Sequence, residues 1–406
     1  MEAARLIAGL ARLVGDVGQA EDLAQDALVA ALEQWPASGV PDNPGAWLMA
    51  VGKRRAVDGF RRREVLERKQ AELARDQLAA GEASELELAA AEEDVGDDLL
   101  RLIFTCCHPV LSAEMRIPLT LRLLGGLTTD EIARAFLVSK QTVAQRIVRA
   151  KRTLAQAHVP FEVPRGAELA PRLASVLGVL YLIFNEGYAA TAGNDWTRPV
   201  LCEEALRLGR VLAALVPREP EVQGLVALME IQSSRLRARA GPDGEPVTLL
   251  EQNRGRWDRL LIGRGLAALA EAERLGSPLG PYALQAAIAA CHARASTAAE
   301  TDWVRIAALY DALAALSHSP VVELNRAVAI AMAYGPQAGL DLVEALGDEP
   351  ALRGYHLLPS VRGDLLSKVG RPEEARRAFE EAAALTRNER ERSLLLSRAA
   401  ACAAGQ

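Results

Sequence analysis

Aromatic side chains make up only 4% of this 406-residue sequence, and no convincing alternation of apolar and polar residues runs along it. Such alternation is the pattern of a half-buried β-strand, so its absence argues against a protein built on sheets. Alanine and leucine are abundant, and half of all residues are apolar. We therefore predict an all-α fold, divided into several modules because the chain is too long for one compact helical domain.

Cysteine is also scarce, with five residues, an odd number, and no CxxC pair. A disulfide framework and a finger-like zinc site are therefore not indicated. Cys106, Cys107 and His108 could suggest a metal site, but no second ligand pair lies at suitable spacing, so we interpret these cysteines as core side chains. The full set is Cys106, Cys107, Cys202, Cys291 and Cys402.

The sequence shows no signal peptide and, by inspection, no apolar run near the roughly 20 residues that span a bilayer, so we expect a cytoplasmic protein without a membrane partner. Its five histidines are scattered and accompany no nucleophile or metal cluster. We expect no catalytic site, no metal and no cofactor. The net charge of −6 excludes general affinity of the whole molecule for nucleic acid. Any contact with a polyanion must therefore lie in local basic patches.

Nine acidic residues and no Lys or Arg lie between Asp76 and Asp98. This composition predicts a linker over residues 71–98, either a flexible acidic tether between two modules or simply a solvated connector.

Residues 127–154, LTTDEIARAFLVSKQTVAQRIVRAKRTL, predict two short helices around a tight turn. Thr128 and Glu131 have the spacing of a capping box, and Ser139 can cap the second helix. Ile132, Ala133 and Phe136 would form the packing face of the first helix. Val143, Ile147, Ala150 and Leu154 would do so in the second.

The opposite side of that second helix carries Gln141, Gln145, Arg149 and Arg152, side chains whose paired hydrogen-bonding groups match base edges in the major groove. Lys140, Arg146, Lys151 and Arg152 could hold phosphates. From Arg116 to Ala157 the net charge is about +6. An amphipathic hairpin with a solvated basic face is the competing interpretation.

Residues 19–35, QAEDLAQDALVAALEQW, predict a helix with an apolar stripe of Leu23, Ala27, Ala31 and Trp35, and with Asp22 and Asp26 on another face. Asn43 and Pro44 then predict the cap and first position of a basic helix. Its cations lie beside Trp47 and Phe60, a mixture suited to phosphates and unstacked bases. They are Lys53, Arg54, Arg55, Arg61, Arg62 and Arg63.

In this order, AEDLAQDALVAALEQW and PGAWLMAVGKRRAVDGFRRR resemble region two of the sigma-70 class of bacterial sigma factors, in particular the extracytoplasmic-function group. LTTDEIARAFLVSKQTVAQRIVRAKRTL resembles region four. The resemblance implies region two over residues 1–70 and region four over residues 99–160.

The resemblance also implies roles for single residues. Asp22 and Asp26 would contact core RNA polymerase, Asp42 and Asn43 would lie near an extruded base of the minus-ten element, and the basic helix would hold the released strand. A second set would meet the minus-thirty-five element, where Ala144 replaces the larger polar residue of many relatives. That set is Lys140, Gln141, Gln145, Arg146 and Arg149, with Arg152 beside them.

Residues 161–406 predict a helical extension with repeat-like spacing. Gly363, Leu366, Ala375, Phe379 and Ala382 match the small and large positions of a tetratricopeptide repeat. A weaker register 36 residues earlier contains Ala327, Ile330, Gly339 and Val343. A capped helical bundle without a ligand is the alternative.

Two segments, YLIFNEGYAATAG (181–193) and TDWVRIAALYDAL (301–313), resemble those of sigma factors with a long helical C-terminal extension. We interpret Glu186 and Tyr188 as packing residues between the sigma module and this extension.

The sequence thus predicts a transcription initiation factor, not an enzyme, that binds core RNA polymerase and promoter DNA. We expect the extension to regulate the factor, either by covering its DNA- or core-binding surfaces or by adding contacts to polymerase. Its expected partner is a regulatory protein or peptide. The alternatives are a one-component helix-turn-helix regulator with a helical ligand- or protein-binding domain, and a scaffold in which the basic segments are solvated faces.

Overall fold

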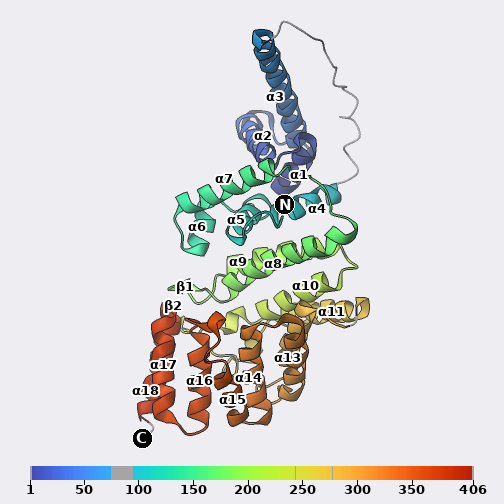
Figure 1. The fold of residues 1–406 in the computed structure, drawn as a ribbon. Helices are drawn as coiled ribbons and strands as arrows, with labels where there is room; N and C mark the ends of the chain where they lie inside the picture. Colours follow the sequence, from blue (N-terminus) through green and yellow to red (C-terminus); the bar gives the residue numbers. More distant parts are fainter. Residues whose placement is uncertain (1, 75–94, 243, 277, 405–406) are drawn as a thin grey trace. The chain divides into compact units, whose positions relative to one another are not determined.

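The computed structural model describes residues 2–74, 95–242, 244–276 and 278–404. The chain divides into two compact units, Met1–Val179 and Leu180–Gln406. Eighteen α-helices account for most of the described residues, so the predicted all-α fold is confirmed. Most of these helices are labelled in Figure 1. The acidic stretch predicted as a linker lies mostly outside the described residues, since helix α3 ends at Ala74 and helix α4 begins at Val95.

The first unit consists of two groups of helices separated by that stretch. Helices α1 and α2 pack on each other and both contact α3, while α5 packs on α7 and α7 on α6. The helices are α1 (Glu2–Val14), α2 (Val17–Ser38), α3 (Pro44–Ala74), α4 (Val95–Cys106), α5 (Ala113–Leu123), α6 (Thr129–Phe136) and α7 (Lys140–Gln156), followed by the start of α8 (Leu169–Tyr188).

Helices α6 and α7 form the helical pair that the sequence predicts, with the predicted caps. Thr128 Oγ1 accepts a hydrogen bond from the Glu131 amide at 3.2 Å, and the Thr128 amide donates to Glu131 Oε2 at 2.7 Å. Ser139 Oγ accepts from the Thr142 amide at 3.0 Å. Between the helices Leu137 adopts a left-handed conformation with φ 49°, which ends α6 and redirects the chain.

The second unit contains the remaining helices and a pair of two-residue parallel strands, β1 (Ala192–Gly193) and β2 (Arg387–Asn388). The helices are α9 (Pro199–Leu215), α10 (Pro220–Ser233), α11 (Arg259–Leu275), α12 (Pro281–Arg294), α13 (Trp303–Ser317), α14 (Pro320–Tyr334), α15 (Pro336–Ala345), α16 (Leu357–Lys368), α17 (Pro372–Leu385) and α18 (Glu389–Ala404). Short 3₁₀ turns occupy Gly166–Glu168 in the first unit and Leu236–Ala238, Arg254–Arg256 and Pro350–Leu352 in the second.

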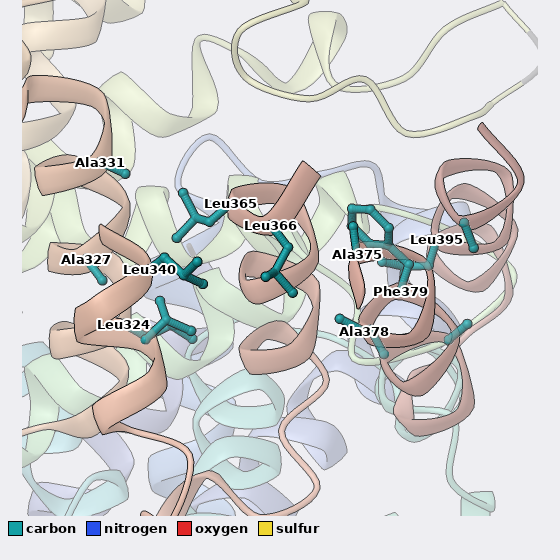
Figure 2. Close-up of a cluster of buried hydrophobic side chains, with 14 residues drawn as sticks. Leu324, Ala327, Ala331, Leu340, Leu365, Leu366, Ala375, Ala378, Phe379 and Leu395 are labelled. Carbon is teal, nitrogen blue, oxygen red and sulfur yellow. The ribbon is translucent and has the colours of Figure 1, made fainter. Parts of the chain in front are cut away.

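Helices α14 to α18 pack in sequence order, each on the next. Figure 2 shows the apolar side chains that they bury together, among them Leu340 of α15, Leu366 of α16 and Phe379 of α17. Gly363 lets this ring approach closely, because a Cβ there would lie 2.9 Å from Phe379 Cδ1. Of the positions in the predicted repeat registers, Leu366, Ala375, Phe379 and Ala382 belong to this cluster, as do Ala327 and Val343. Ile330 packs against a different cluster.

Helix α8 corrects one expectation. Together with the preceding turn, Gly166–Tyr188 is long and apolar enough to cross a membrane, so the expectation that no apolar run approaches that length is wrong. Length and composition alone also describe the core helix of a globular protein. Leu173, Val176, Ile183 and Phe184 are buried along α8, as they would be in such a helix.

Candidate nucleic-acid and polymerase interfaces

Helix α7 buries one face and leaves the opposite face open. Val143, Ile147, Ala150 and Leu154 are buried, as predicted. The face opposite carries exposed side chains at helical spacing, and none of them forms an ion pair or side-chain hydrogen bond within the described part of the chain. They are Gln141, Gln145, Arg149 and Arg152, with Ala144 and Val148 between them.

Val148 was not singled out by the sequence pattern, yet its side chain is 63% exposed in the middle of this stripe. An exposed apolar group beside glutamines and arginines suits contact with a thymine methyl group. The other residues of this face were identified from sequence because they are polar, and this valine was missed because it is not.

Two predicted phosphate-binding residues are ion-paired at the edges of the stripe. Lys140 Nζ lies 2.8 Å from Asp130 Oδ2, with both side chains largely exposed. Arg146 Nη2 lies 2.8 Å from Glu114 Oε2. Exposed pairs of this kind contribute at most about 1 kcal/mol, so a phosphate can replace the carboxylates at low cost.

Helix α2 presents Asp22 and Asp26 to solvent, on the outer side of the first three helices. Asp22 forms no ion pair with the described residues, whereas Asp26 Oδ2 lies 3.0 Å from Arg55 Nη1 of α3. A predicted polymerase contact and a predicted DNA contact therefore neutralise each other in this conformation.

Three apolar side chains accompany these carboxylates on α2. Leu28 is 39%, Val29 49% and Leu32 77% exposed. An acidic helix that also exposes a row of large aliphatic groups is suited to docking on another protein. The sequence pattern identified the apolar stripe that packs inward, and its members Ala27 and Ala31 are buried. It gave no reason to single out the exposed row of Leu28, Val29 and Leu32.

The loop between α2 and α3 contains Asp42 and Asn43, both exposed. Asn43 Oδ1 accepts a hydrogen bond from the Ala46 amide at 3.0 Å, so the predicted cap of α3 is present. Beside the loop the rings of Trp35 and Trp47 lie with centroids 5.4 Å apart.

The basic helix α3 continues from this loop. Arg54 and Arg61 are exposed and Lys53 is half-buried. The side chains of Arg62 and Arg63 lie outside the described residues.

A buried carboxylate joins the two helical groups of the first unit. Glu21 of α2 has Oε1 2.8 Å from Arg122 Nε of α5 and Oε2 2.5 Å from Lys151 Nζ of α7. Its side chain is only 6% exposed. Lys151, interpreted from sequence as a phosphate contact, is thus held by an internal carboxylate. Near α1 and α4, Arg12 Nε lies 3.2 Å from Asp98 Oδ2.

Burial acts to raise the pKa of Glu21, but the hydrogen bonds and positive charges of Lys151 and Arg122 outweigh it, and the pKa is lowered. Glu21 is therefore charged at neutral pH, and both cations have a counter-charge there.

Cys106 and Cys107 are buried core residues, as predicted. Burial raises the pKa of Cys107 to about 11, and that of Cys106 well above its ordinary value. Neither is therefore a thiolate at neutral pH. Within the described ranges, no three His, Cys, Asp or Glu side chains gather as a metal site requires.

In the second unit Glu186 accepts hydrogen bonds from Thr191 Oγ1, at 2.9 Å, and from Arg198. Tyr188 Oη accepts one from Arg235 Nη2 at 2.6 Å. All three partners lie within the same unit, so these bonds give no support to the predicted role of Glu186 and Tyr188 between the sigma module and the extension.

Comparison with known families gives matches along much of the chain. Residues 2–65 match Sigma-70 region 2, residues 101–154 match Sigma-70 region 4, and residues 172–273 match a family of unknown function, DUF6596. A curated relative, the uncharacterized protein R00370 of Rhizobium meliloti (strain 1021), is 45% identical over 381 residues, which cover 93% of this chain and 89% of the relative. No solved structure matches the chain.

Proposed function

Because the chain belongs to the sigma-70 family of sigma factors, we propose that it directs core RNA polymerase to a bipartite promoter. It carries regions 2 and 4 of that family and is similar to R00370 over 93% of its length. The observation that carries the proposal is the open face of α7, where four polar side chains have no partner inside the described protein. Side chains that can pair with bases and are paired with nothing else are available to a DNA groove.

In this proposal α7 enters the major groove of the minus-thirty-five element. Gln141, Gln145 and Arg149 read base edges, while Lys140, Arg146 and Arg152 hold phosphates. The ion pairs of Lys140 and Arg146 exchange their carboxylates for phosphates when DNA binds.

The α2–α3 group binds polymerase and the minus-ten element. Asp22 and Asp26, together with the exposed Leu28, Val29 and Leu32, form the docking surface for core polymerase. Asp42 and Asn43 lie beside the extruded base, and Lys53, Arg54, Arg55, Arg61 and Arg62 hold the displaced strand, whose binding offsets the few kcal/mol of base extrusion.

We further propose that the chain is a cytoplasmic member of the extracytoplasmic-function group. Helices α14 to α18 would act as a tetratricopeptide-like extension that regulates the factor, with a protein or peptide as partner. Catalysis, metals and cofactors have no part in this function.

Run-off transcription with purified core polymerase on a pool of promoter fragments tests the proposal. The full-length protein should support initiation on a subset of fragments. Arg149→Ala should reduce that initiation about tenfold, since a good base contact contributes about 1–3 kcal/mol.

Arg134→Ala is the matched control. Arg134 is exposed on the neighbouring helix α6, forms no ion pair with the described residues, and carries the same charge. It should leave initiation nearly unchanged. If the full-length protein neither binds core polymerase nor supports initiation on any fragment, the proposal fails.

A further inference from the structure

Guanidinium groups and aromatic rings alternate in a row within the second unit. The Arg239 guanidinium carbon lies 3.9 Å from the ring centroid of Tyr188 and 5.2 Å from that of Trp196. Arg235 lies 5.7 Å from the ring centroid of Tyr188 and 5.6 Å from that of Trp257. Each ring attracts the cation beside it and fixes its plane. Arg235 Nη2 also donates to Tyr188 Oη at 2.6 Å and to Gln232 Oε1.

The far end of the row is held by the protein itself. Arg254 lies 5.1 Å from the ring of Trp257 and donates to the carbonyls of His292 and Ala295 and to Thr301 Oγ1. These three bonds make Arg254 a structural residue that anchors the row.

The opposite end has no such acceptors. Arg239 donates no side-chain hydrogen bond to the described protein, and it is only half-buried. Five buried N–H groups along the row lack partners, the Nε atoms of Arg235, Arg239 and Arg254 and the Nε1 atoms of Trp196 and Trp257. All five are donors, so the missing group is an acceptor.

The unbalanced positive charge of these arginines also indicates that an anionic acceptor is missing. Arg235 is 7% exposed and has no ion pair among the described residues, and Arg239 has none either. Glu230, another buried charge of this unit, is matched by Arg210 at 2.8 Å. A guanidinium group cannot lose its proton at neutral pH, and burying it without a counter-charge destabilises the folded protein.

The neighbouring histidine responds to this excess of positive charge. Burial, together with the positive charges of Arg235 and Arg254, lowers the pKa of His292 to about 3. His292 is therefore neutral at pH 7 and adds no charge of its own.

We propose that Arg235 and Arg239, with the indole N–H of Trp196, form a binding site for a phosphate group. A phosphate carries a charge of about −1.5 to −2 at pH 7, which matches the two cations, whereas a single carboxylate would leave one unpaired. Its tetrahedral oxygens can accept from the Nε groups of both arginines, which have no hydrogen-bond partner in the described protein. The site lies within residues 172–273, the segment whose family has no assigned function, and it is independent of the promoter proposal.

Calorimetric titration of the full-length protein tests this site, with inorganic phosphate, glycerol phosphate and acetate as three probes at constant ionic strength. Phosphate or glycerol phosphate should bind, and acetate should bind at least tenfold more weakly. The tryptophan fluorescence should change on the same titration, because Trp196 and Trp257 belong to the row.

Arg239→Gln should weaken phosphate binding at least tenfold, and Arg239→Lys, which keeps the charge but loses the planar fork, should weaken it less. Arg237→Gln is the matched control, since Arg237 lies two residues away, is exposed and has no ion pair in the described protein. Circular dichroism checks that each variant is folded.

Three results would overturn the proposal: neither phosphate probe binds, acetate binds as tightly as phosphate, or Arg237→Gln weakens binding as much as Arg239→Gln. Binding of glycerol phosphate but not inorganic phosphate would assign the site to phosphate esters, and the reverse preference to free phosphate.

Discussion

Glu21 joins the two helical groups of the first unit through two ion pairs. It is buried on α2, and its two oxygens accept from α5 and α7. Its neighbour Asp22 faces solvent. Adjacent acidic residues on one helix thus have opposite tasks, one internal and one available to a partner.

Glu21→Gln should lower the free energy of unfolding by about 2 kcal/mol at pH 7, because a charge-assisted hydrogen bond contributes about 1.5–3 kcal/mol and the two cations are partly exposed to solvent. Since the folded-state pKa is lowered, the stabilisation is present above the ordinary pKa of 4.5 and is lost as pH falls through the folded value. Urea unfolding at pH 7 and in acid measures both effects.

The matched control is Glu33→Gln, at an exposed position of the same helix without a partner in the described protein. It should change stability by less than about 0.5 kcal/mol. A difference between wild type and Glu21→Gln that stays constant from pH 7 into acid would contradict the assignment of this stabilisation to the carboxylate charge.

At the scale of elements, close helix contacts in the extension depend on glycine. A Cβ on Gly339 of α15 would lie 2.4 Å from Ala331 Cβ and 2.6 Å from the Ala327 carbonyl oxygen of α14. Gly339→Ala should therefore destabilise the protein by about 1–3 kcal/mol through overpacking.

Gly263→Ala in α11 provides the comparison, because nothing lies within 4 Å of its added Cβ. There alanine should stabilise by up to about 1 kcal/mol through its higher helix propensity. Thermal unfolding of the two variants should give shifts of opposite sign. A shift of the same sign and size in both would show that the α14–α15 contact does not require glycine.

The sequence predicts local features of the elements well. The capping box at Thr128, the cap at Ser139 and the cap at Asn43 are all present, because each depends on residues at most three positions apart. The packing face of α7 follows from the same local periodicity.

Contacts between distant segments could not be predicted in this way. Glu21 and Arg122 are 101 residues apart, and no spacing rule joins them. The row from Tyr188 to Trp257 draws on three segments, and only the motif around Tyr188 was singled out from sequence. Burial and missing partners, which are three-dimensional properties, distinguish these residues from other arginines and aromatics.

At the scale of the molecule, the first unit extends to Val179, beyond the end of region 4. Ser175 Oγ donates to the Cys107 carbonyl oxygen at 2.6 Å, and Arg172 Nη2 donates to the Phe104 carbonyl oxygen at 3.2 Å. The first ten residues of α8 thus complete the packing of α4 and α5, and Leu173 and Val176 are buried there.

A protein truncated after Val179 should therefore unfold at a higher temperature than one truncated after Pro160, which loses these bonds and exposes the apolar side chains beneath them. Scanning calorimetry of the two proteins measures the difference. Equal unfolding temperatures would show that α8 contributes nothing to the stability of the first unit.

Run-off transcription with the protein truncated after Val179 reports the effect of the extension. More transcription than with the full-length protein indicates that the extension inhibits, and loss of transcription indicates that it assists.

The Glu21 bridge sets a limit on how far apart the proposed DNA-reading groups can be. Gln141 lies ten residues from Lys151 on α7, about 15 Å, and the part of α2 beyond Glu21 adds about 26 Å before the loop to Asn43. Positions minus ten and minus thirty-five are about 25 base pairs apart by their numbers, or about 85 Å of duplex at about 3.4 Å per base pair. Under the proposed function, we expect both elements to be occupied together only after this bridge opens, and its strength would then be subtracted from the affinity for the promoter.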